Sequence, residues 1–348
     1  MTQKAVSLLH AAKREPLDLI AVISLDRTFF AARGLVWAGL AILALSLLTI
    51  QWNQWWATNL LANFHVHLAL AGAALVAFGL VWRRWLQTGI GAAIILANVG
   101  LVASQIPPAA ATAAVAGGTP VRVLTINVLF DNRNIEAMRS QIAALAPDVV
   151  LMQEVNWRWS RDLAALDDLY PYRLPLTRAR PLLDEHGTVL FSRFPIEEAA
   201  RPRLGGVEGR LTAARVSVDG RPLWLASTHL VKPNTPSGEA LQRAQMRDLA
   251  DWAGTIGEPL VIGGDFNATI HMTQLDELVQ DQRFATDLQA DRWWKVAVGT
   301  YPSWLPLLGL KIDHVLARDA AIEASDIVTI AGSDHRAVVA DIVVPAQR

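Results

Sequence analysis

The sequence predicts an apolar helical region followed by an α/β domain of roughly 230 residues. Between Gly34 and Val121 the only charged side chains are Arg83 and Arg84, which a globular core would not produce. From Val121 onward, apolar runs of strand length alternate with helical spacing and no internal repeat is present. Several of these runs end in an acid, an amide or a histidine. The chain therefore divides into a membrane region and a domain with polar groups at the ends of its strands.

Three apolar stretches in residues 1–106 are long enough to cross a bilayer. We predict spans at about 35–52, 63–82 and 88–106. At ~1.5 Å per residue each approaches the ~30 Å hydrocarbon thickness. Tryptophans lie at both boundaries, as an aromatic belt requires: Trp52, Trp55, Trp56, Trp82 and Trp85. Buried core helices are the alternative, which the length and lack of charge disfavour.

Basic residues set the predicted orientation. They precede the first span or lie between the second and third: Lys4, Lys13, Arg14, Arg27, Arg33, Arg83 and Arg84. The loop at 51–63 contains no lysine or arginine. Because basic segments stay cytoplasmic, the N-terminus is expected inside, and three spans place the following domain outside. The arginine- and alanine-rich composition is typical of a bacterium, so we expect a multi-pass protein of the bacterial cytoplasmic (inner) membrane with a periplasmic domain.

Composition excludes some classes of site. There is no cysteine, so disulfides and thiolate metal sites are excluded. From Pro107 onward 24 basic residues face 29 acidic ones, a balance of −5. This is the wrong sign for a protein that holds nucleic acid mainly by neutralising phosphates. The Ala-rich stretch within 107–120 is expected to be a linker.

The domain from residue 121 onward shows alternating strand and helix signals. Strands are predicted at 122–128, 149–152, 188–191, 211–218, 223–226, 259–262 and 338–344, and helices at 135–145 and 239–252. Pro147 ends the first helix, and Asp219-Gly220 is expected to form a hairpin turn. Asn127, Glu154, His229 and Asp265 then fall near strand ends. Carboxylate oxygens gathered at one rim of a sheet suit a hard cation such as Mg²⁺.

These motifs together resemble the endonuclease/exonuclease/phosphatase superfamily, whose type is pancreatic deoxyribonuclease. The residues that carry the resemblance are Asn127, Gln153-Glu154, Ser192-Arg193-Phe194-Pro195, Thr228-His229-Leu230, Gly264-Asp265-Phe266-Asn267, Ile312-Asp313-His314 and Ser333-Asp334-His335. The likeness covers about residues 121–344. It implies a four-layer α/β/β/α sandwich in a catalytic domain at 121–348, a divalent-metal site at one end, and phosphoric ester hydrolysis.

The resemblance, together with the chemistry of each side chain, assigns a candidate site. Metal-side residues are Asn127, Glu154 and Asp334, and catalytic residues are His229, Asp265, Asn267, Asp313 and His335. Mg²⁺ is the expected cofactor, with Mn²⁺ as the alternative. Either Asp265 or His335 is the general base, and Asp313 would set the His335 tautomer. Taken one at a time, these residues also have structural explanations, as a cap at a strand end, as turn residues or as hydrogen-bonded polar residues. His314 follows Asp313 on a strand and is expected to pack on the other face.

The substrate is not fixed by the fold. The apolar stretch 301–310, just before Asp313, favours a phosphorylated lipid in the bilayer, and packing of these residues in the core is the alternative. Apolar spans followed by such a domain are similar to bacterial membrane proteins linked to glycopeptide resistance, which implies a lipid-carrier pyrophosphate. One alternative is an exported nuclease with a basic groove built from Arg158, Arg161, Arg178 and Arg180. Another is a receptor that binds phosphorylated ligands without turnover. No obligate protein partner is expected.

Overall fold

The computed structural model describes residues 15–52, 54–105, 117–156, 159, 163–174, 187–288 and 297–346, with only the helical path given for 15–31. The chain forms two compact units. One comprises the residues up to Leu48 together with His67–Gly100, and the other comprises Thr49–Val66 and the chain from Leu101 onward. Most of the expected linker, residues 107–116, lies outside the described residues, whereas Thr119 and Pro120 already belong to the first strand.

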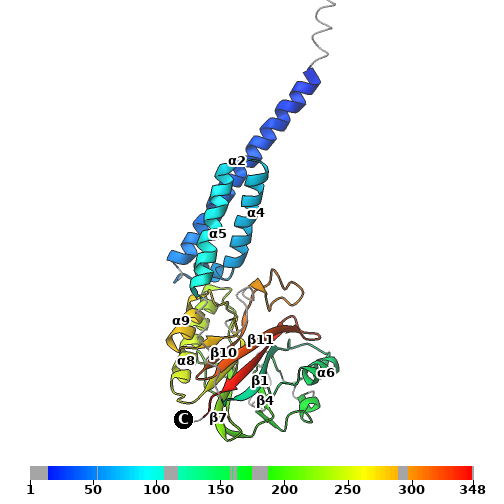
Figure 1. Cartoon of the computed structure of the whole chain (residues 1–348), viewed down its shortest axis with the longest axis vertical. Helices are drawn as coiled ribbons and strands as arrows, with labels where there is room; N and C mark the ends of the chain where they lie inside the picture. Colours follow the sequence, from blue (N-terminus) through cyan, green and yellow to red (C-terminus); the bar gives the residue numbers. More distant parts are fainter. Residues whose placement is uncertain are drawn as a thin grey trace, which may run out of the picture. The chain divides into compact units, whose positions relative to one another are not determined.

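The first unit is built from long helices labelled α2, α4 and α5 in Figure 1. Their bounds are Glu15–Gln51, His65–Val81 and Trp85–Gln105. Leu75, Ile90 and Ile94 form a small buried cluster between them. Glycines let α4 and α5 approach closely, because a Cβ on Gly91 would lie 2.6 Å from the carbonyl oxygen of Gly72. The unit is therefore a packed helical bundle with an apolar exterior.

Two helices in the described residues are long and apolar enough to cross a membrane. They are Ala32–Gln51 and Trp85–Gln105, and they correspond to the first and third predicted spans. The second predicted span falls on α4, which becomes a third candidate only if it is joined with α3 (Trp56–Ala62) across a bend of 67°. Two candidate spans, rather than three, are thus defined by length and composition.

The second unit contains two six-stranded sheets (Figure 1). The first has the order β11-β12-β1-β2-β4-β3 and the second β5-β6-β7-β8-β10-β9. The strands of the first sheet are β1 Thr119–Asn127, β2 Val149–Gln153, β3 Tyr172–Leu174, β4 Val189–Ser192, β11 Ala321–Thr329 and β12 Arg336–Val344. Those of the second are β5 Ile196–Ala200, β6 Leu211–Val218, β7 Arg221–His229, β8 Leu260–Asp265, β9 Ala285–Thr286 and β10 Asp313–Arg318.

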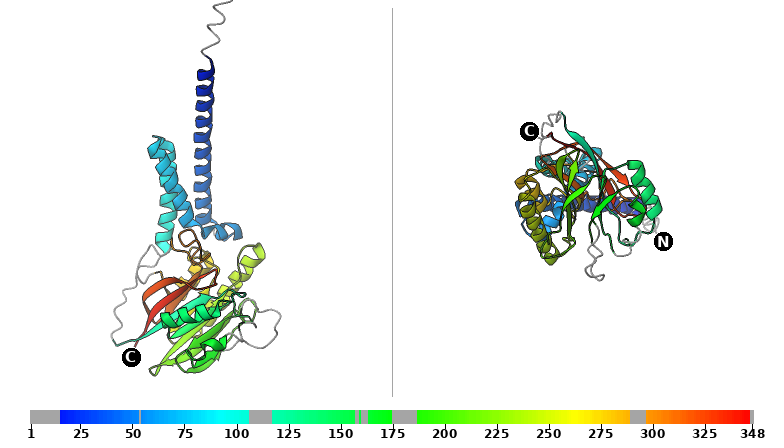
Figure 2. Two further views of the ribbon diagram at one scale, coloured as in Figure 1. Left: turned by 90° about the vertical axis from the view of Figure 1, so that its right-hand side faces the viewer. Right: turned by 90° about the horizontal axis from the view of Figure 1, so that it is seen from below.

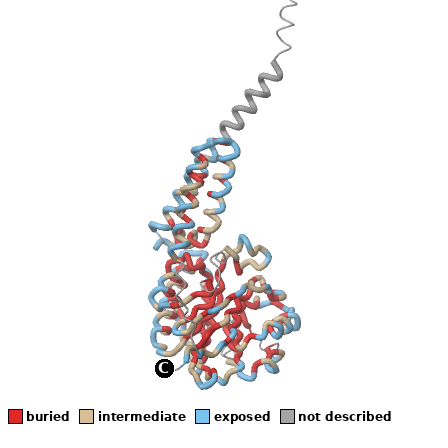
Figure 3. Tube along the Cα trace, in the orientation of Figure 1, coloured by how far each residue is buried: buried red, intermediate tan, exposed pale blue. Residues whose placement is uncertain are grey.

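The sheets pack face to face and helices cover their outer faces (Figure 2, right). Between the sheets lies a cluster of small and branched side chains that includes Val123, Leu151 and Val261. Helix α6 (Ile135–Leu145) packs on the first sheet through Met138 and Ile142. Helices α8 (Pro236–Gly254) and α9 (Thr273–Asp281) cover the second sheet. Figure 3 shows the buried residues concentrated in these layers. The two-sheet α/β sandwich implied by the resemblance is confirmed.

Two parallel strand pairs place the polar strand ends together. β1 runs parallel to β2, and β7 runs parallel to β8. The glycine before Asp265 permits close pairing of β7 and β8, because a Cβ on Gly264 would lie 1.9 Å from the carbonyl oxygen of Thr228. Parallel strands finish at the same edge of a sheet, so their C-terminal residues share one rim.

Candidate active site

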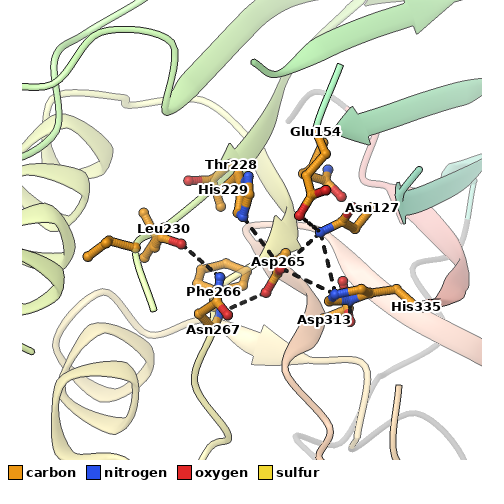
Figure 4. A network of polar contacts seen from close by, with 12 residues as sticks. Asn127, Glu154, Thr228, His229, Leu230, Asp265, Phe266, Asn267, Asp313 and His335 are labelled. Carbon is orange, nitrogen blue, oxygen red and sulfur yellow. Dashed lines mark hydrogen bonds and ion pairs between the residues drawn. The ribbon is translucent and has the colours of Figure 1, made fainter. Parts of the chain in front are cut away.

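Strand register brings the predicted site residues to one rim. In the second sheet, Asp265 at the end of β8 pairs with His229 of β7 on one side and with Asp313 of β10 on the other. In the first sheet, Asn127 at the end of β1 pairs with Gln153, and Glu154 follows directly. The two rims face each other across the sandwich, so acids, amides and histidines from both sheets meet (Figure 4).

Asp265 occupies the centre of the site (Figure 4). Its Oδ2 accepts a hydrogen bond from Asn127 Nδ2 at 3.1 Å. The same oxygen lies 3.6 Å from His229 Nε2 and 3.7 Å from His335 Nε2. Oδ1 accepts the backbone N–H of Asn267 at 2.8 Å. Asp265 is fully buried, so one carboxylate is fixed between two imidazoles from different sheets.

A carboxylate behind His335 fixes the orientation of this histidine. His335 Nδ1 lies 2.9 Å from Asp313 Oδ2, so Nδ1 carries the proton and Nε2 is directed toward Asp265. The ring of Tyr301 lies against the His335 ring, with centroids 4.8 Å apart. The backbone N–H of His335 donates to Ser333 Oγ at 2.9 Å. The imidazole is thus held by a carboxylate and an aromatic face, and the backbone that carries it is held by Ser333.

Asn127 and Glu154 connect the first sheet to Asp265. Asn127 Nδ2 donates to Glu154 Oε1 at 3.0 Å, and Glu154 Oε2 accepts the N–H of Phe130 at 3.1 Å. Asn127 Oδ1 accepts the N–H of Leu129, so in this arrangement its nitrogen, rather than its oxygen, faces the carboxylates. Glu154 is buried, and its backbone φ of 59° is unusual for a residue other than glycine.

Asn267 and Asp334 occupy less central positions. Asn267 has a φ of 49° and its Nδ2 donates to the carbonyl oxygen of Leu230 at 2.8 Å, which leaves one amide hydrogen for another acceptor. Asp334 shares no hydrogen bond with the other candidates among the described residues, although its charge acts on His335. Its Oδ1 is buried without a hydrogen-bond partner in the described part of the chain.

The electrostatics of Asp265 and His335 depend on each other. The pKa of Asp265 is raised to about 7, mainly by burial; the positive charge of His335 opposes this shift and the negative charge of Asp313 adds to it. Burial alone would lower the pKa of His335, but the charges of Asp313 and Asp265 outweigh it and raise the pKa to about 9. Near neutral pH the metal-free site therefore contains a positively charged His335 imidazolium beside the Asp265 carboxyl group, which is partly protonated.

We expect Asp313→Asn to lower the pKa of His335 by about one unit or more, because the largest charge that raises it is lost. In the wild type the folded pKa lies above the unfolded value. His335 therefore stabilises the fold below about pH 6.5, and this contribution disappears as the pH rises through about 9. An NMR titration of the imidazole in chelator measures both proteins. The exposed Asp319→Asn is the control, and an unchanged His335 titration in Asp313→Asn would contradict this assignment.

The donor set fits a hard divalent cation. Asp265, Asp313 and His335 each offer a ligand atom, and these atoms lie within 4.8 Å of one another. Asp313 Oδ1 and Asp334 Oδ1 are buried without hydrogen-bond partners in the described part of the chain. Glu154 supplies two further oxygens on the facing sheet. Buried carboxylate oxygens without hydrogen-bond partners favour a metal ion, and oxygen donors favour Mg²⁺, Mn²⁺ or Ca²⁺.

Some contributors were not predicted from the sequence. Thr300, which was not predicted, accepts the N–H groups of Ile312 and Asp313 through Oγ1. Ser333 was predicted only as part of a motif, and its Oγ donates to the Asn127 carbonyl oxygen at 2.6 Å. Tyr301 was recognised only as part of an apolar stretch. These contacts depend on a loop that returns to the site, which no local pattern encodes. His314, as predicted, packs away from the site against Phe266. The arginines proposed for a nucleic-acid groove, at 158, 161, 178 and 180, lie outside the described residues.

Comparison with known proteins identifies the family and the fold. Residues 124–335 match the family described as the Endonuclease/Exonuclease/phosphatase family. A search of curated proteins finds no match. Three solved structures illustrate the fold. An endonuclease/exonuclease/phosphatase from Beutenbergia cavernae DSM 12333 is 21% identical with a TM-score of 0.55 over 65% of this chain and 72% of that chain. A Bacteroides vulgatus endonuclease/exonuclease/phosphatase is 19% identical with a TM-score of 0.51 over 64% and 98%.

The third structure is D. rerio TDP2 complexed with a single-strand DNA product. It is 15% identical, with a TM-score of 0.53 over 64% of this chain and 99% of that chain. At these identities the structural likeness establishes the fold alone, whereas the family match covers more than half of the chain.

Proposed function

The chain belongs to the endonuclease/exonuclease/phosphatase family of phosphoester hydrolases, and on this premise we propose that it is a membrane-anchored, Mg²⁺-dependent enzyme that hydrolyses a phosphate or pyrophosphate ester of a membrane lipid. The observation that carries the proposal is a buried site of acids, amides and histidines that is joined directly to an exposed apolar loop.

Asp265 and the two histidines divide the acid–base work. Asp265 orients a water molecule through Oδ2 and accepts its proton, a role suited to a carboxyl group with a pKa of about 7. His229 and His335, 3.6 and 3.7 Å from that oxygen, contact phosphoryl oxygens or protonate the leaving oxygen. Asp313 holds His335 in the required tautomer. Asn127 and Asn267 place amide N–H groups at the site without adding negative charge.

Carboxylates from both sheets would hold the metal. Glu154 is the proposed main ligand, with Asp265, Asp313 or Asp334 contributing from the facing side. When bound, Mg²⁺ supplies charge neutralisation for the phosphoryl oxygens. The Asn127 amide nitrogen bridges Glu154 and Asp265 by donating a hydrogen bond to each carboxylate.

The loop at 301–310 supports a lipid substrate. Trp304 and Leu307 at its tip are 76% and 72% exposed, whereas an apolar core loop would bury them. Its base contacts the site directly, because Tyr301 packs on His335 and the Ser303 N–H donates to the Asp334 carbonyl oxygen at 2.7 Å. An acyl or isoprenyl chain held by the tip would place its phosphate near His335.

Membrane anchoring completes the proposal. The two candidate spans, with the bent pair α3 and α4 as a third, would anchor the domain, and the distribution of basic residues favours an extracytoplasmic, periplasmic catalytic domain. An anchored domain of this kind would meet lipid substrates in the outer leaflet without a soluble carrier protein.

The test is a parallel assay of purified full-length protein in detergent with a polyprenyl pyrophosphate, a water-soluble phosphodiester and plasmid DNA, with Mg²⁺ or with chelator. Metal-dependent phosphate release from the lipid, without nicking of the plasmid, is the expected result. Nicking with the lipid untouched would replace the lipid proposal by the nuclease alternative. Binding of the lipid without turnover of any substrate would favour the receptor alternative.

Loop variants test the lipid contact within the same assay. We expect Trp304→Ser combined with Leu307→Ser to lower activity on the lipid about tenfold, because apolar area is lost from substrate binding. Activity on the water-soluble ester should change less than twofold. Tyr172→Ser, at a partly exposed aromatic of β3, is the matched control. Equal loss on both substrates would instead assign the loop a role in shaping the site.

A further inference from the structure

Helix α3, between the first two long helices, forms part of the same compact unit as the catalytic sandwich. Two asparagines of this segment are buried there: Asn59 is 0% exposed, and Asn63, at the C-terminal end of α3, is 6% exposed. Buried amides are costly unless they are hydrogen-bonded, so their partners identify what the segment does.

Both asparagines accept hydrogen bonds from the backbone that follows the catalytic turn. Asn63 Oδ1 accepts the N–H of Thr269 at 2.9 Å. Asn59 Oδ1 accepts the N–H of Thr273, the first residue of α9, at 3.1 Å. The N-cap position of α9 is Met272, whose side chain provides no capping hydrogen bond. Asn59 therefore caps this helix from more than 200 positions away in the sequence.

The nitrogen of Asn59 begins a chain of buried amides. Asn59 Nδ2 donates to Gln274 Oε1 at 2.6 Å, and Gln274 Nε2 donates to Gln242 Oε1 at 2.6 Å. Gln242 Nε2 then donates to the carbonyl oxygens of Phe266 and Asn267 at 3.1 and 3.0 Å. We call Asn59, Gln274 and Gln242 the amide relay. None of its members is more than 2% exposed, so water does not compete for these hydrogen bonds.

The relay ends on the turn that fixes the central carboxylate. Asn267 has a left-handed backbone conformation, and its N–H holds Asp265 Oδ1. A turn in this conformation keeps its shape only while its neighbours restrain it. We propose that Asn59, acting through the amide relay, is a positioning residue for the Asp265–Asn267 turn, so that the segment between the membrane helices is a working part of the active site.

The alternative is that these amides only stabilise the fold. Both readings predict a lower unfolding temperature when the relay is broken, because buried polar groups lose their partners. They differ in the rate per folded molecule, since misplacement of a catalytic group lowers kcat without necessarily changing substrate binding.

The test compares the same substitution, glutamine to methionine, at two positions of α9. Gln274→Met removes the middle of the relay at similar side-chain volume, and Gln280→Met alters an exposed residue of the same helix outside the relay. In the full-length protein with Mg²⁺ and the water-soluble phosphodiester, we expect Gln274→Met to lower kcat about tenfold with KM changed less than twofold. Gln280→Met should match the wild type. Unchanged kcat per folded molecule in Gln274→Met would overturn the positioning role.

Two further measurements distinguish failure of the amide relay from failure of the proposed function, on which the relay's role rests. Amide hydrogen exchange of the segment containing Asp265 to Ala268 should be faster in Gln274→Met than in Gln280→Met, and this readout needs no substrate. Equal protection would overturn the proposal even if every variant were inactive. Asn59→Ala with Gln274→Met should be no slower than the worse single variant, because both break one relay. Additive losses would contradict a shared route.

Discussion

Asp265→Asn is expected to lower kcat by about 10³-fold on any substrate the protein hydrolyses, because the substitution removes the proton acceptor and keeps the side-chain size. It should not lower the unfolding temperature of the metal-free protein. The carboxylate is fully buried near Asp313 and Glu154, and burial already raises its pKa, so the relief of buried negative charge offsets the loss of one of its two acceptor oxygens. Initial rates with Mg²⁺ and thermal unfolding in chelator measure the two quantities.

The control for this variant is Asp251→Asn, an exposed position on α8. It should leave both rate and unfolding temperature unchanged. If Asp265→Asn kept more than a tenth of the wild-type rate, Asp265 could not be the group that deprotonates water, and His335 would become the base. If activity fell together with stability, the loss would reflect a disrupted rim rather than missing chemistry.

Glu154→Gln is expected to raise the Mg²⁺ concentration needed for half-maximal activity by ~100-fold or more. Loss of groups that merely support a metal ligand costs about 10–100-fold, and Glu154 is the proposed ligand itself. A glutamine oxygen can still accept a hydrogen bond from the backbone N–H of Phe130 or from Asn127 Nδ2, so the rim should keep its shape. Metal titration of the rate, from micromolar upward, measures the effect.

A second readout for Glu154→Gln does not depend on turnover. Ligand that binds only the folded state raises the unfolding temperature, so Mg²⁺ should stabilise the wild type and hardly affect the variant. Glu277→Gln, on the exposed side of α9, should retain the wild-type response. An unaltered metal requirement in Glu154→Gln would move the metal to the facing group of Asp265, Asp313 and His335.

The rim residues were predictable because strand ends carry a strong local signal. An apolar run of strand length followed by an acid or histidine identified Glu154, His229 and Asp265 as strand-end residues. Parallel pairing of β1 with β2 and of β7 with β8 then brings these strand ends to one rim. Strands at or near the sheet edges were missed. β3 and β9 have only three and two residues, too few for a pattern, and β11 alternates irregularly around a register shift at Ile322/Ala324.

Contacts that depend on side-chain direction were beyond local sequence reasoning. The sequence placed Asn127 at the site, but whether its oxygen or nitrogen faces the carboxylates depends on the N–H of Leu129. The buried Asp287–Lys311 pair, 2.7 Å apart, left no signal because each residue alone looks like a surface charge. Docking of α3 was equally invisible, since an asparagine in a short helix gives no sign of its distant partner.

The long sequence separation within the amide relay also bears on how the protein matures. Asn59 and Gln274 are 215 residues apart, so ribosomes finish α3 well before its partner is synthesised. Hydrogen bonds that close such large loops form late and slowly. The N-terminal end of α9 and the turn after Asp265 would therefore be among the last regions to be completed. If the relay positions the turn, a newly made chain would have no finished rim, and so no hydrolysis, until its early and late segments had joined.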